Sequence, residues 1–300
     1  MDPLSDILSL LKPQSSISAG LDAGGDWAIR FGGHEGIKFN AVMRGACWVW
    51  VEGDPEPYRM EEGDCFLLTK GRPFSFATDL SLPPIEASTI YDKARDGVAT
   101  CNGGGDFFLI GWRFTFAAPH AELLSAALPA VVRVREASSQ ASVLRWGLDQ
   151  LAAELRDRRP GGFLVSEHLA HIMLVQVLRI YLGSPEGGGT SWLQALADAR
   201  MSKAVGAMHA EPAHRWTLEE LAGVAGMSRS SFAERFKQVV GTSPIEYLTR
   251  WRMLVASDRL RNSRQSVAAI ALSIGYESES AFSTAFKRTM ARSPRQYQRG

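Results

Sequence analysis

The spacing of apolar and polar positions changes along the chain and divides it into two regimes. Up to residue 116, short apolar stretches alternate with glycine, proline and aspartate, as in Ala46–Val51, Cys65–Thr69 and Phe107–Phe116. Apolar runs of this length, bounded by turn-forming residues, predict β-strands. The first 116 residues are therefore expected to form a β-rich domain.

From about Ser138 the apolar residues recur at steps of three and four, which is the spacing of one helix face. One such series is Val143, Leu144, Leu148, Leu151 and Leu155. The next, from Leu169 to Leu182, has too many apolar members for a one-sided helix. The glycine-rich stretch Gly183–Thr190 predicts a flexible linker, and the pattern is helical from there onward.

The last hundred residues contain an internal repeat. Seven residues recur fifty positions later: Ser228, Phe232, Phe236, Lys237, Ser243, Pro244 and Tyr247 match Ser278, Phe282, Phe286, Lys287, Ser293, Pro294 and Tyr297. Two copies are too few for a solenoid, because stacked repeats need about three units to bury a continuous core. The repeat therefore predicts a duplicated supersecondary unit.

Each copy carries the signals of a short helix, a glycine turn and a second helix. In the first copy Thr217 and Glu220 predict a capping box, Gly226 ends the helix, and Ser228 opens the next. The phenylalanines, four residues apart, face inward and lock the second helix onto the first. This is the pattern of a helix-turn-helix, whose second helix lies in the major groove of DNA. A plain helical bundle is the alternative.

Charge is distributed unevenly between the two regimes. Residues 198–300 carry 16 Lys and Arg against 9 Asp and Glu, whereas the remaining residues carry 17 against 23. A basic C-terminal third suits the phosphate backbone of DNA. Cys47, Cys65 and Cys101 are too few and too scattered for a disulfide framework or a zinc site. With neither a signal-peptide pattern nor a run of eighteen apolar residues, a cytoplasmic location is expected.

The segment Ile270–Lys287, followed by Ser293-Pro294-Arg-Gln-Tyr297, resembles the signature of the AraC/XylS family of bacterial regulators. The resemblance extends over about Asp198–Gly300. It implies two helix-turn-helix units joined by one long helix, here about Pro244–Leu260, which would be roughly 25 Å long. That length brings the two units near the ~34 Å repeat of successive major grooves.

The resemblance also implies which residues read bases. They are Ser230, Ala233 and Glu234 in the first unit, and Ser280, Ala281 and Thr284 in the second. Many relatives have Gln or Arg at the positions of Ala233 and Glu234, and Arg at that of Thr284. Arg229 and Arg235 flank Glu234 and are candidates for guanine or phosphate contacts. Lys237, Lys287 and Arg288 complete the expected DNA-binding set.

Three N-terminal segments resemble the cupin-type sensor domain found in one branch of the AraC family. They are His34–Asn40, Arg44–Trp48 and Glu62–Phe74, and the resemblance covers about residues 2–190. It implies a small β-barrel followed by helices that mediate dimerisation in relatives. The apolar segment Val165–Leu182 suits that role, and packing on its own barrel is the alternative.

Several side chains of this region are candidates for sensing a signal. His34 and Lys38 are candidate polar contacts of an effector, and Trp48, Trp50 and Trp112 are either core residues or walls of its pocket. Cys101 lies beside a run of three glycines, so it is expected to be exposed and is a candidate redox sensor. Cys47 and Cys65 lie in apolar strands and are expected in the core.

A metal-dependent cupin enzyme fused to a DNA-binding module is the rival interpretation. Such a site needs about three histidines and a carboxylate around one metal. Only His34 lies before Phe116, no HxH pair occurs there, and Phe74 stands where the second cupin motif would place a histidine. His168 and His171 are one helical turn apart, but no third ligand is visible. No metal or other cofactor is therefore expected, and no enzyme activity.

The expected fold class is α+β, in four segments. They are a cupin-like β-barrel (1–136), a helical dimerisation or connector region (137–182), a flexible linker and lead-in (183–197), and an all-α double helix-turn-helix domain (198–300). The expected partners are double-stranded promoter or operator DNA, a second copy of the chain, RNA polymerase and an unidentified small-molecule effector. No membrane is expected.

Overall fold

The structure is a computed structural model that describes residues 2–95, 97–116, 121–135, 142–157, 159–184 and 189–299. The chain divides into two compact units. The barrel unit comprises the described residues between 13 and 184, and the helical unit comprises residues 2–12 together with 189–299.

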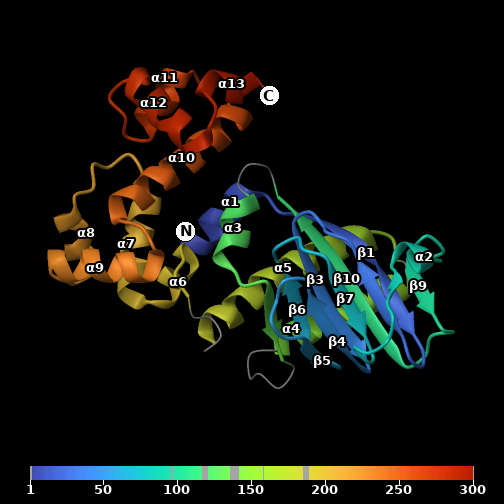
Figure 1. Cartoon of the computed structure of the whole chain (residues 1–300). Coiled ribbons are helices and arrows are strands. Elements are labelled where there is room, and N and C mark those ends of the chain that lie inside the picture. The colour runs from blue at the N-terminus through green and yellow to red at the C-terminus, as the bar shows by residue number, and fades with distance from the viewer. Residues whose placement is uncertain are drawn as a thin grey trace. The chain divides into compact units, whose positions relative to one another are not determined.

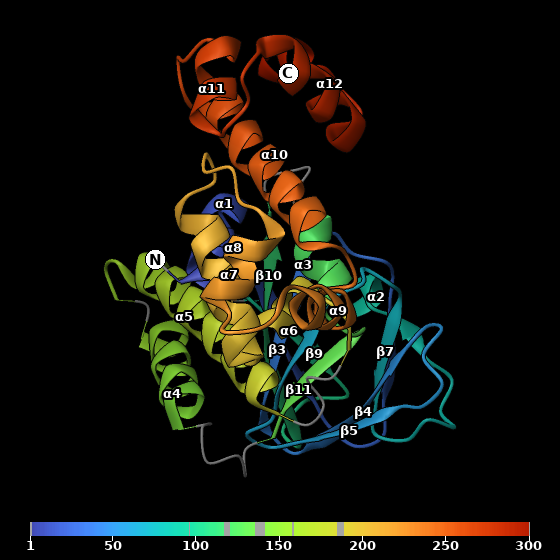
Figure 2. The ribbon, with the colours of Figure 1, turned by 90° about the vertical axis from the view of Figure 1, so that its left-hand side faces the viewer.

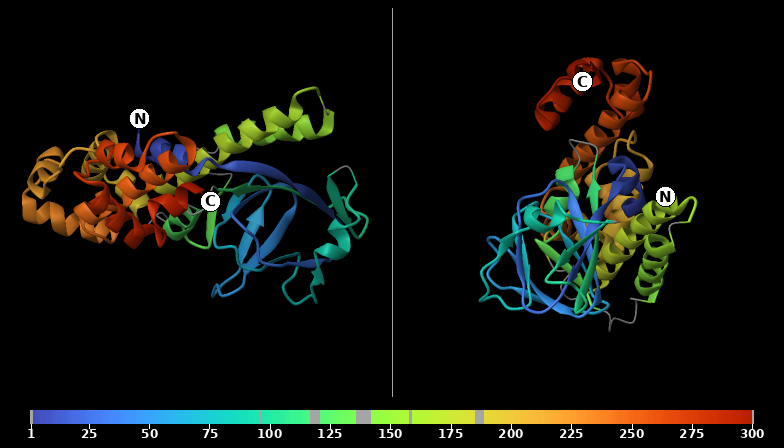
Figure 3. Two further views of the ribbon diagram at one scale, coloured as in Figure 1. Left: turned by 90° about the horizontal axis from the view of Figure 1, so that it is seen from above. Right: turned by 90° about the vertical axis from the view of Figure 1, so that its right-hand side faces the viewer.

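Eleven described strands form the two sheets of the barrel unit (Figures 1 and 3). In chain order they are β1 (Gln14–Ala23), β2 (Ala28–Phe31), β3 (Ile37–Arg44), β4 (Ala46–Val51), β5 (Tyr58–Glu61), β6 (Cys65–Leu68), β7 (Phe74–Ala77), β8 (Ile85–Glu86), β9 (Val98–Cys101), β10 (Phe107–Thr115) and β11 (Val131–Val134). One sheet has the order β11-β6-β3-β10-β1-β9, and the other has the order β5-β4-β7-β2-β8. Within these sheets only the β1–β9 and β2–β8 pairs are parallel.

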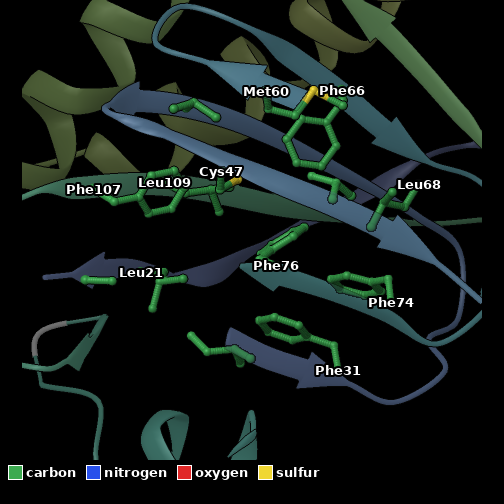
Figure 4. Close-up of a cluster of buried hydrophobic side chains, with 14 of the residues drawn as sticks. Leu21, Phe31, Cys47, Met60, Phe66, Leu68, Phe74, Phe76, Phe107 and Leu109 are labelled. Carbon is green, nitrogen blue, oxygen red and sulfur yellow. The ribbon is translucent and has the colours of Figure 1, made fainter. Parts of the chain in front are cut away.

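The space between the two sheets is filled by apolar side chains (Figure 4). Strand alternation supplies them, because successive side chains of a strand point to opposite faces. In β4, for example, Cys47, Val49 and Val51 are buried in this core. The rings of Phe31 and Phe74 stack with their centroids 4.7 Å apart. The predicted β-rich domain is confirmed.

Four helices accompany the barrel: α2 (Ser88–Tyr91), α3 (Ala121–Ala127), α4 (Ser142–Asp157) and α5 (Gly162–Gly183). The long pair α4 and α5 pack on each other, and α5 also packs on β11 and β1. By length and composition alone α5 is apolar enough to cross a membrane, and it is the one described helix that meets that test. Its buried residues, such as Met173 and Val177, lie on the side that packs within the barrel unit, and 39% of the apolar window is buried.

The helical unit contains nine described helices (Figures 1 and 2). They are α1 (Pro3–Leu11), α6 (Trp192–Ala197), α7 (Ala199–Ala210), α8 (Leu218–Val224), α9 (Arg229–Val240), α10 (Pro244–Asn262), α11 (Val267–Ser273), α12 (Glu279–Met290) and α13 (Pro294–Arg299). The pairs α8–α9 and α11–α12 lie at opposite ends of α10 (Figure 2). The chain thus has two helix-turn-helix units joined by one continuous helix.

The predicted start and stop signals are confirmed in both helix-turn-helix units. Thr217 and Glu220 form the reciprocal capping box, and Gly226 has a φ of +64° after α8. The hydroxyl oxygens of Ser228 and Ser278 accept hydrogen bonds from backbone N–H groups in the first turns of α9 and α12. All four phenylalanines of the repeat, Phe232, Phe236, Phe282 and Phe286, are fully buried. Burying each ring contributes about 1.5–3 kcal/mol to stability.

One boundary differs from the sequence-based expectation, and another agrees with it. Residues 2–12, assigned there to the sensor barrel, form α1 and belong to the helical unit. The predicted linker and lead-in, 183–197, contains α6, which packs on α7 and α9. Residues 185–188 of that linker lie outside the described part of the chain, so its flexibility stays a prediction. The helix expected beyond Thr190 is therefore present, and its Trp192 and Leu193 are buried.

Candidate DNA interface and sensor pocket

The second helix of the first helix-turn-helix unit, α9, divides into a buried and an exposed face. Phe232 and Phe236 are buried on one side, whereas Ser230, Glu234 and Lys237 are exposed on the other. The exposed three recur at intervals of four and three residues, so they form one stripe along the helix. Ala233 is half-buried at the edge of this stripe, and Arg229 is exposed in the first turn. The predicted reading residues therefore share one accessible face.

Arg235 lies on a different flank of α9 from that stripe. Its Nε and Nη2 atoms donate hydrogen bonds of 3.1 and 3.0 Å to Oδ2 of Asp198, which caps the start of α7. Desolvation raises the pKa of the Asp198 carboxyl. Hydrogen bonds from the backbone of α7 and from the Arg235 guanidinium outweigh that effect, so the pKa is lowered overall. Arg235 thus ties α9 to α7 within the protein, and a contact with DNA would require that pair to open.

The second unit presents a similar face on α12. Ser280, Ala281, Thr284, Lys287 and Arg288 are all exposed. The Thr284 hydroxyl donates a hydrogen bond of 3.1 Å to the backbone carbonyl of Ser280, so its hydrogen is already used within α12. The short side chains allow the helix backbone to approach a groove closely.

Four cations lie on the exposed surfaces of α9 and α12. In the described part of the chain, Arg229, Lys237, Lys287 and Arg288 form no ion pair. They therefore remain free to contact phosphate oxygens, which favour charge-assisted hydrogen bonds from arginine and lysine. Glu234 is the one acidic residue among the predicted reading positions, and its Oε1 lies 3.4 Å from Nε2 of Gln238. A carboxylate accepts hydrogen bonds from the amino group of cytosine.

In the barrel unit, His34 and Lys38 contact the same aromatic ring. The His34 ring meets Phe74 edge-on with 5.8 Å between centroids. The Lys38 ammonium lies 4.8 Å from the centroid of Phe74 and 5.3 Å from that of Phe31. A cation over ring faces gains a favourable electrostatic interaction. The two predicted polar contacts are therefore close together, above the stacked Phe31–Phe74 pair.

Burial and like charges shift both groups toward their neutral forms. Burial, with the charges of Lys38 and Arg113 nearby, lowers the pKa of His34 to about 4. Burial and the charge of Arg113 lower the pKa of Lys38 to about 8. Neither Lys38 nor Arg113 forms an ion pair with a described carboxylate. The site therefore has a positive potential that a bound anion would relieve.

Arg113 is absent from the sequence-based set of candidates. It lies in β10 directly opposite Lys38 of β3. Leu109, four residues earlier in the same strand, is buried in the barrel core, so strand alternation places Arg113 on the inward side at the end of the sheet. The alternation of inward and outward positions in β10 is the sequence signal that could have identified Arg113 as a candidate.

A cavity of about 190 Å³ lies beside His34, and it is lined by His34, Gly36, Ile37, Thr69, Lys70, Gly71, Phe116 and Ser125. Both ring nitrogens of His34 are buried without a hydrogen-bond partner among the described residues. Gly36 and Gly71 have φ angles of +72° and +67°, and a Cβ at Gly36 would lie 2.0 Å from the carbonyl oxygen of Phe114. Only glycine fits such a close approach, so the loop that carries His34 is built around these two residues.

The predicted tryptophans do not converge on this site. Trp48 and Trp50 alternate with the inward residues of β4, so they face away from the barrel interior, and Trp50 is 41% exposed. The Trp48 ring instead packs against the Arg59 guanidinium. Trp112 is 1% exposed and meets Phe39 edge-on, so it is a core residue. The expected core position therefore holds for Trp112 and is wrong for Trp50, and a contact of these rings with an effector stays a prediction.

The prediction that Cys101 is exposed is also wrong. The residue ends β9 and is only 4% exposed, packed in the barrel core, although the glycines that follow it form a surface turn. Burial raises the pKa of its thiol, which opposes formation of the reactive thiolate. Cys47 and Cys65 are buried as expected, and burial raises the pKa of each thiol to about 12.

Two other described histidines of the barrel unit, His168 and His171, lie on α5. His171 Nε2 lies 2.8 Å from the carbonyl oxygen of Pro13, and its ring packs on Phe114. His168 is exposed on α5. Among the residues that the structure describes, no three His, Cys, Asp or Glu side chains gather in a group able to hold a metal ion.

Two helix-turn-helix units on one connecting helix, preceded by a double-sheet barrel, define the class of DNA-binding regulators with a separate sensor unit. Comparison with known proteins agrees. A family profile described as Cupin matches residues 2–183, and one described as Helix-turn-helix domain matches residues 221–300. The chain belongs to the AraC-type family of transcription regulators, and it is a DNA-binding transcription regulator with an N-terminal cupin domain.

Two relatives match this chain over 99% or more of its length. A putative AraC-like transcription regulator of Streptomyces antibioticus is 46% identical over 299 residues, which are 100% of this chain and 99% of that protein. The HTH-type transcriptional regulator AlkR of Acinetobacter baylyi is 30% identical, with 99% of each chain covered. A solved AraC-type transcriptional regulator from Chromobacterium violaceum is 27% identical, covers 35% of this chain and 93% of its own, and has a TM-score of 0.34. These relatives are named as regulators of transcription, not as enzymes.

Proposed function

We propose that a small anionic effector controls this regulator by binding at the mouth of the barrel, over Phe31 and Phe74. The observation that carries the proposal is the group formed by His34, Lys38 and Arg113. His34 and Lys38 are half-buried, Arg113 is exposed beside them, and neither Lys38 nor Arg113 pairs with a described carboxylate. Removing an ammonium from water without an opposite charge is costly, so a bound anion would stabilise this arrangement.

The surroundings of the cations narrow the chemistry of the effector. Asn40 lies two residues from Lys38 on the same face of β3, and its buried side-chain nitrogen has no hydrogen-bond partner among the described residues. Phe31 and Phe74 provide an apolar floor. A carboxylate or a similar anion attached to a flat or apolar group would satisfy all three features.

Analysis of bound small molecules tests this proposal. Protein purified natively from its source cells is denatured, and the released molecules are identified by mass spectrometry. Wild type is expected to release an anionic molecule that Lys38→Met does not retain. Lys93→Met, at an exposed lysine, is the matched control and should retain it. Equal release by wild type and Lys38→Met, or release of neutral molecules alone, would contradict the proposal.

The DNA contacts proposed for this chain follow from the exposed faces of α9 and α12. Ser230, Ala233 and Glu234 read bases in one major groove, and Ser280, Ala281 and Thr284 read them in the next. Arg229, Lys237, Lys287 and Arg288 contact phosphates. The effector acts by favouring one arrangement of the two units, because equal affinity for both would shift nothing. The protein acts in the cytoplasm, and contact with RNA polymerase stays a prediction.

A homodimer is the proposed assembly, and the apolar outer surface of α4 and α5 supports it. Trp146 of α4 is 53% exposed, and Ile172 of α5 is 45% exposed. Phe163, Leu164 and Val165 add further exposed apolar area at the start of α5. Several exposed large apolar residues on one helix pair are a feature of protein–protein interfaces. A second copy of the chain is the proposed occupant.

A further inference from the structure

The first helix, α1, is built to dock on another surface. Asp2 caps its start by accepting from Ser5 N–H at 3.1 Å, Pro3 occupies the first turn, and Lys12 ends it in the left-handed conformation with a φ of 45°. Leu4, Ile7, Leu8 and Leu11 recur at the helix period and are all buried. A helix of nine residues is not stable alone in water, so this one depends on the surface that it covers.

That surface belongs to the DNA-binding helices. α1 packs on α6, α7 and α10 in the helical unit (Figure 2). Gly206 of α7 faces Pro3: a Cβ added there would lie 3.9 Å from the proline ring, in ordinary van der Waals contact. The apolar face of α1 therefore completes the core of a unit whose other members begin nearly 180 residues later in the chain.

Polar contacts fix α1 to α7 and α10. The Asp6 carboxylate lies 3.4 Å from Nδ1 of His209 in α7. His209 Nε2 is 2.8 Å from the Tyr247 hydroxyl of α10, and its ring stacks on Trp251 with 3.7 Å between centroids. This group connects α1 to both helices through one buried imidazole.

A second contact lies farther along α10. The Lys12 ammonium forms an ion pair with Asp258 at 2.7 Å. Tyr247 and Asp258 are eleven residues apart, or roughly 16 Å along a helix. α1 thus lies along α10, and α10 is the helix that sets the separation of α9 and α12.

We propose that α1 is a docked segment of the DNA-binding unit that must be in place on α7 and α10 for full DNA affinity. Without it, the apolar face beneath Leu4, Ile7, Leu8 and Leu11 is open, and α7 and α10 lose a common partner. Because α7 packs on α8 and α6 packs on α9, the first helix-turn-helix unit is then held less firmly relative to α10, so fewer molecules are competent to bind both grooves. The apparent dissociation constant rises in proportion to the loss of that competent fraction.

α1 is joined to the first strand of the barrel by a very short connection. Only Lys12 and Pro13 separate α1 from β1, and the carbonyl of Pro13 lies against His171 in the barrel unit. β1 pairs with β10, the strand that carries Arg113. A change at the barrel mouth therefore has a short covalent route to α1. This last step rests on the proposed effector control, whereas the requirement for docking does not.

The experiment compares full-length variants on a DNA fragment that wild type has selected from a random-sequence pool. Ile7→Glu/Leu11→Glu places two charges on the buried face of α1, and Ser9→Glu, on its exposed face, is the control. Fluorescence anisotropy measures the dissociation constant, and hydrogen exchange reports whether α1 is released. The double variant is expected to bind at least about tenfold more weakly. Ser9→Glu is expected to bind as wild type does.

A synthetic peptide of residues 2–12 then separates docking from general damage. Added in excess to the double variant, the wild-type peptide is expected to restore binding, whereas a peptide with the same two glutamates is not. Wild-type affinity in a variant whose α1 exchanges freely, or a loss that the wild-type peptide does not repair, would overturn the proposal. No effector is present, so either outcome is independent of the anion-binding proposal.

Discussion

At the scale of single residues, His209 is a histidine kept neutral by its surroundings. It is buried between Tyr247 and Trp251, and burial lowers its pKa to about 3. Its pKa in the unfolded chain is near 6.5. The folded state therefore binds fewer protons than the unfolded state between these two values. Its contribution to stability is complete above about pH 6.5 and is lost as the pH falls toward 3.

We predict that the free energy of unfolding of the full chain falls between about pH 7 and 5.5, by at most about 1.4 kcal/mol per pH unit from this group. Burial raises the pKa of Asp6, so this carboxyl makes the folded state more stable as the pH falls, opposite to His209. Its effect lies at lower pH, closer to the ordinary pKa of a carboxyl. His209→Gln should flatten the slope, and His214→Gln, at an exposed histidine, should keep it. Urea unfolding at several pH values measures both. Identical slopes in wild type and His209→Gln would refute the assignment.

Whether a residue is buried or exposed could be predicted where helix spacing or strand alternation determines it. The inward phenylalanines of the repeat followed from their i and i+4 spacing. Strand alternation in β4 also held enough information to place Trp48 and Trp50 outward, because Cys47, Val49 and Val51 take the inward face. Cys101 was not predictable in this way. Its burial depends on which strands close over the end of β9, and that is a property of the assembled barrel.

At the scale of elements, the helix-turn-helix units were the most predictable parts. Their caps, turns and buried faces are all encoded within about twenty residues, so local signals suffice. The connecting helix was also expected, and the structure extends it to Asn262. α1 shows the limit of this approach. Its own signals (Asp2, Pro3 and the Leu4–Leu11 spacing) are visible, but nothing local indicates that its partner surface lies in the C-terminal unit.

The α4–α5 pair carries a prediction about assembly. Ile172→Lys places a charge in the exposed apolar surface proposed to meet a second copy, and desolvating that charge opposes association. We expect the dissociation constant of the dimer to rise by at least about tenfold, or about 1.4 kcal/mol. Sedimentation velocity over a concentration series measures it. Gln150→Lys adds the same charge at an exposed polar position of α4 and should associate as wild type does.

A dimer of unchanged stability in Ile172→Lys would exclude this surface. If wild type itself stayed monomeric across the series, the proposed assembly would be abandoned.

At the scale of the whole molecule, the two units contribute different parts of one function. The helical unit carries α9 and α12 at opposite ends of α10 (Figure 2), and the cations on their exposed faces form no ion pair with the described residues. In the barrel unit the half-buried Lys38 lies over the rings of Phe31 and Phe74, with the exposed Arg113 opposite it on the neighbouring strand. The family assignment joins these observations to DNA-binding regulation of transcription. Which arrangement of the units binds DNA best is what an effector would decide.

The central claim is that both helix-turn-helix units contact DNA at once, and hydroxyl-radical footprinting of the full chain tests it most directly. On a fragment selected by wild type, we predict two protected patches per protomer, about one helical turn apart on one face of the duplex. Raising the salt concentration should weaken both patches steeply, because phosphate contacts release counterions. Lys287→Ala together with Arg288→Ala should weaken the patch under α12 more than the patch under α9. A single protected patch per protomer, or protection insensitive to salt, would contradict the account.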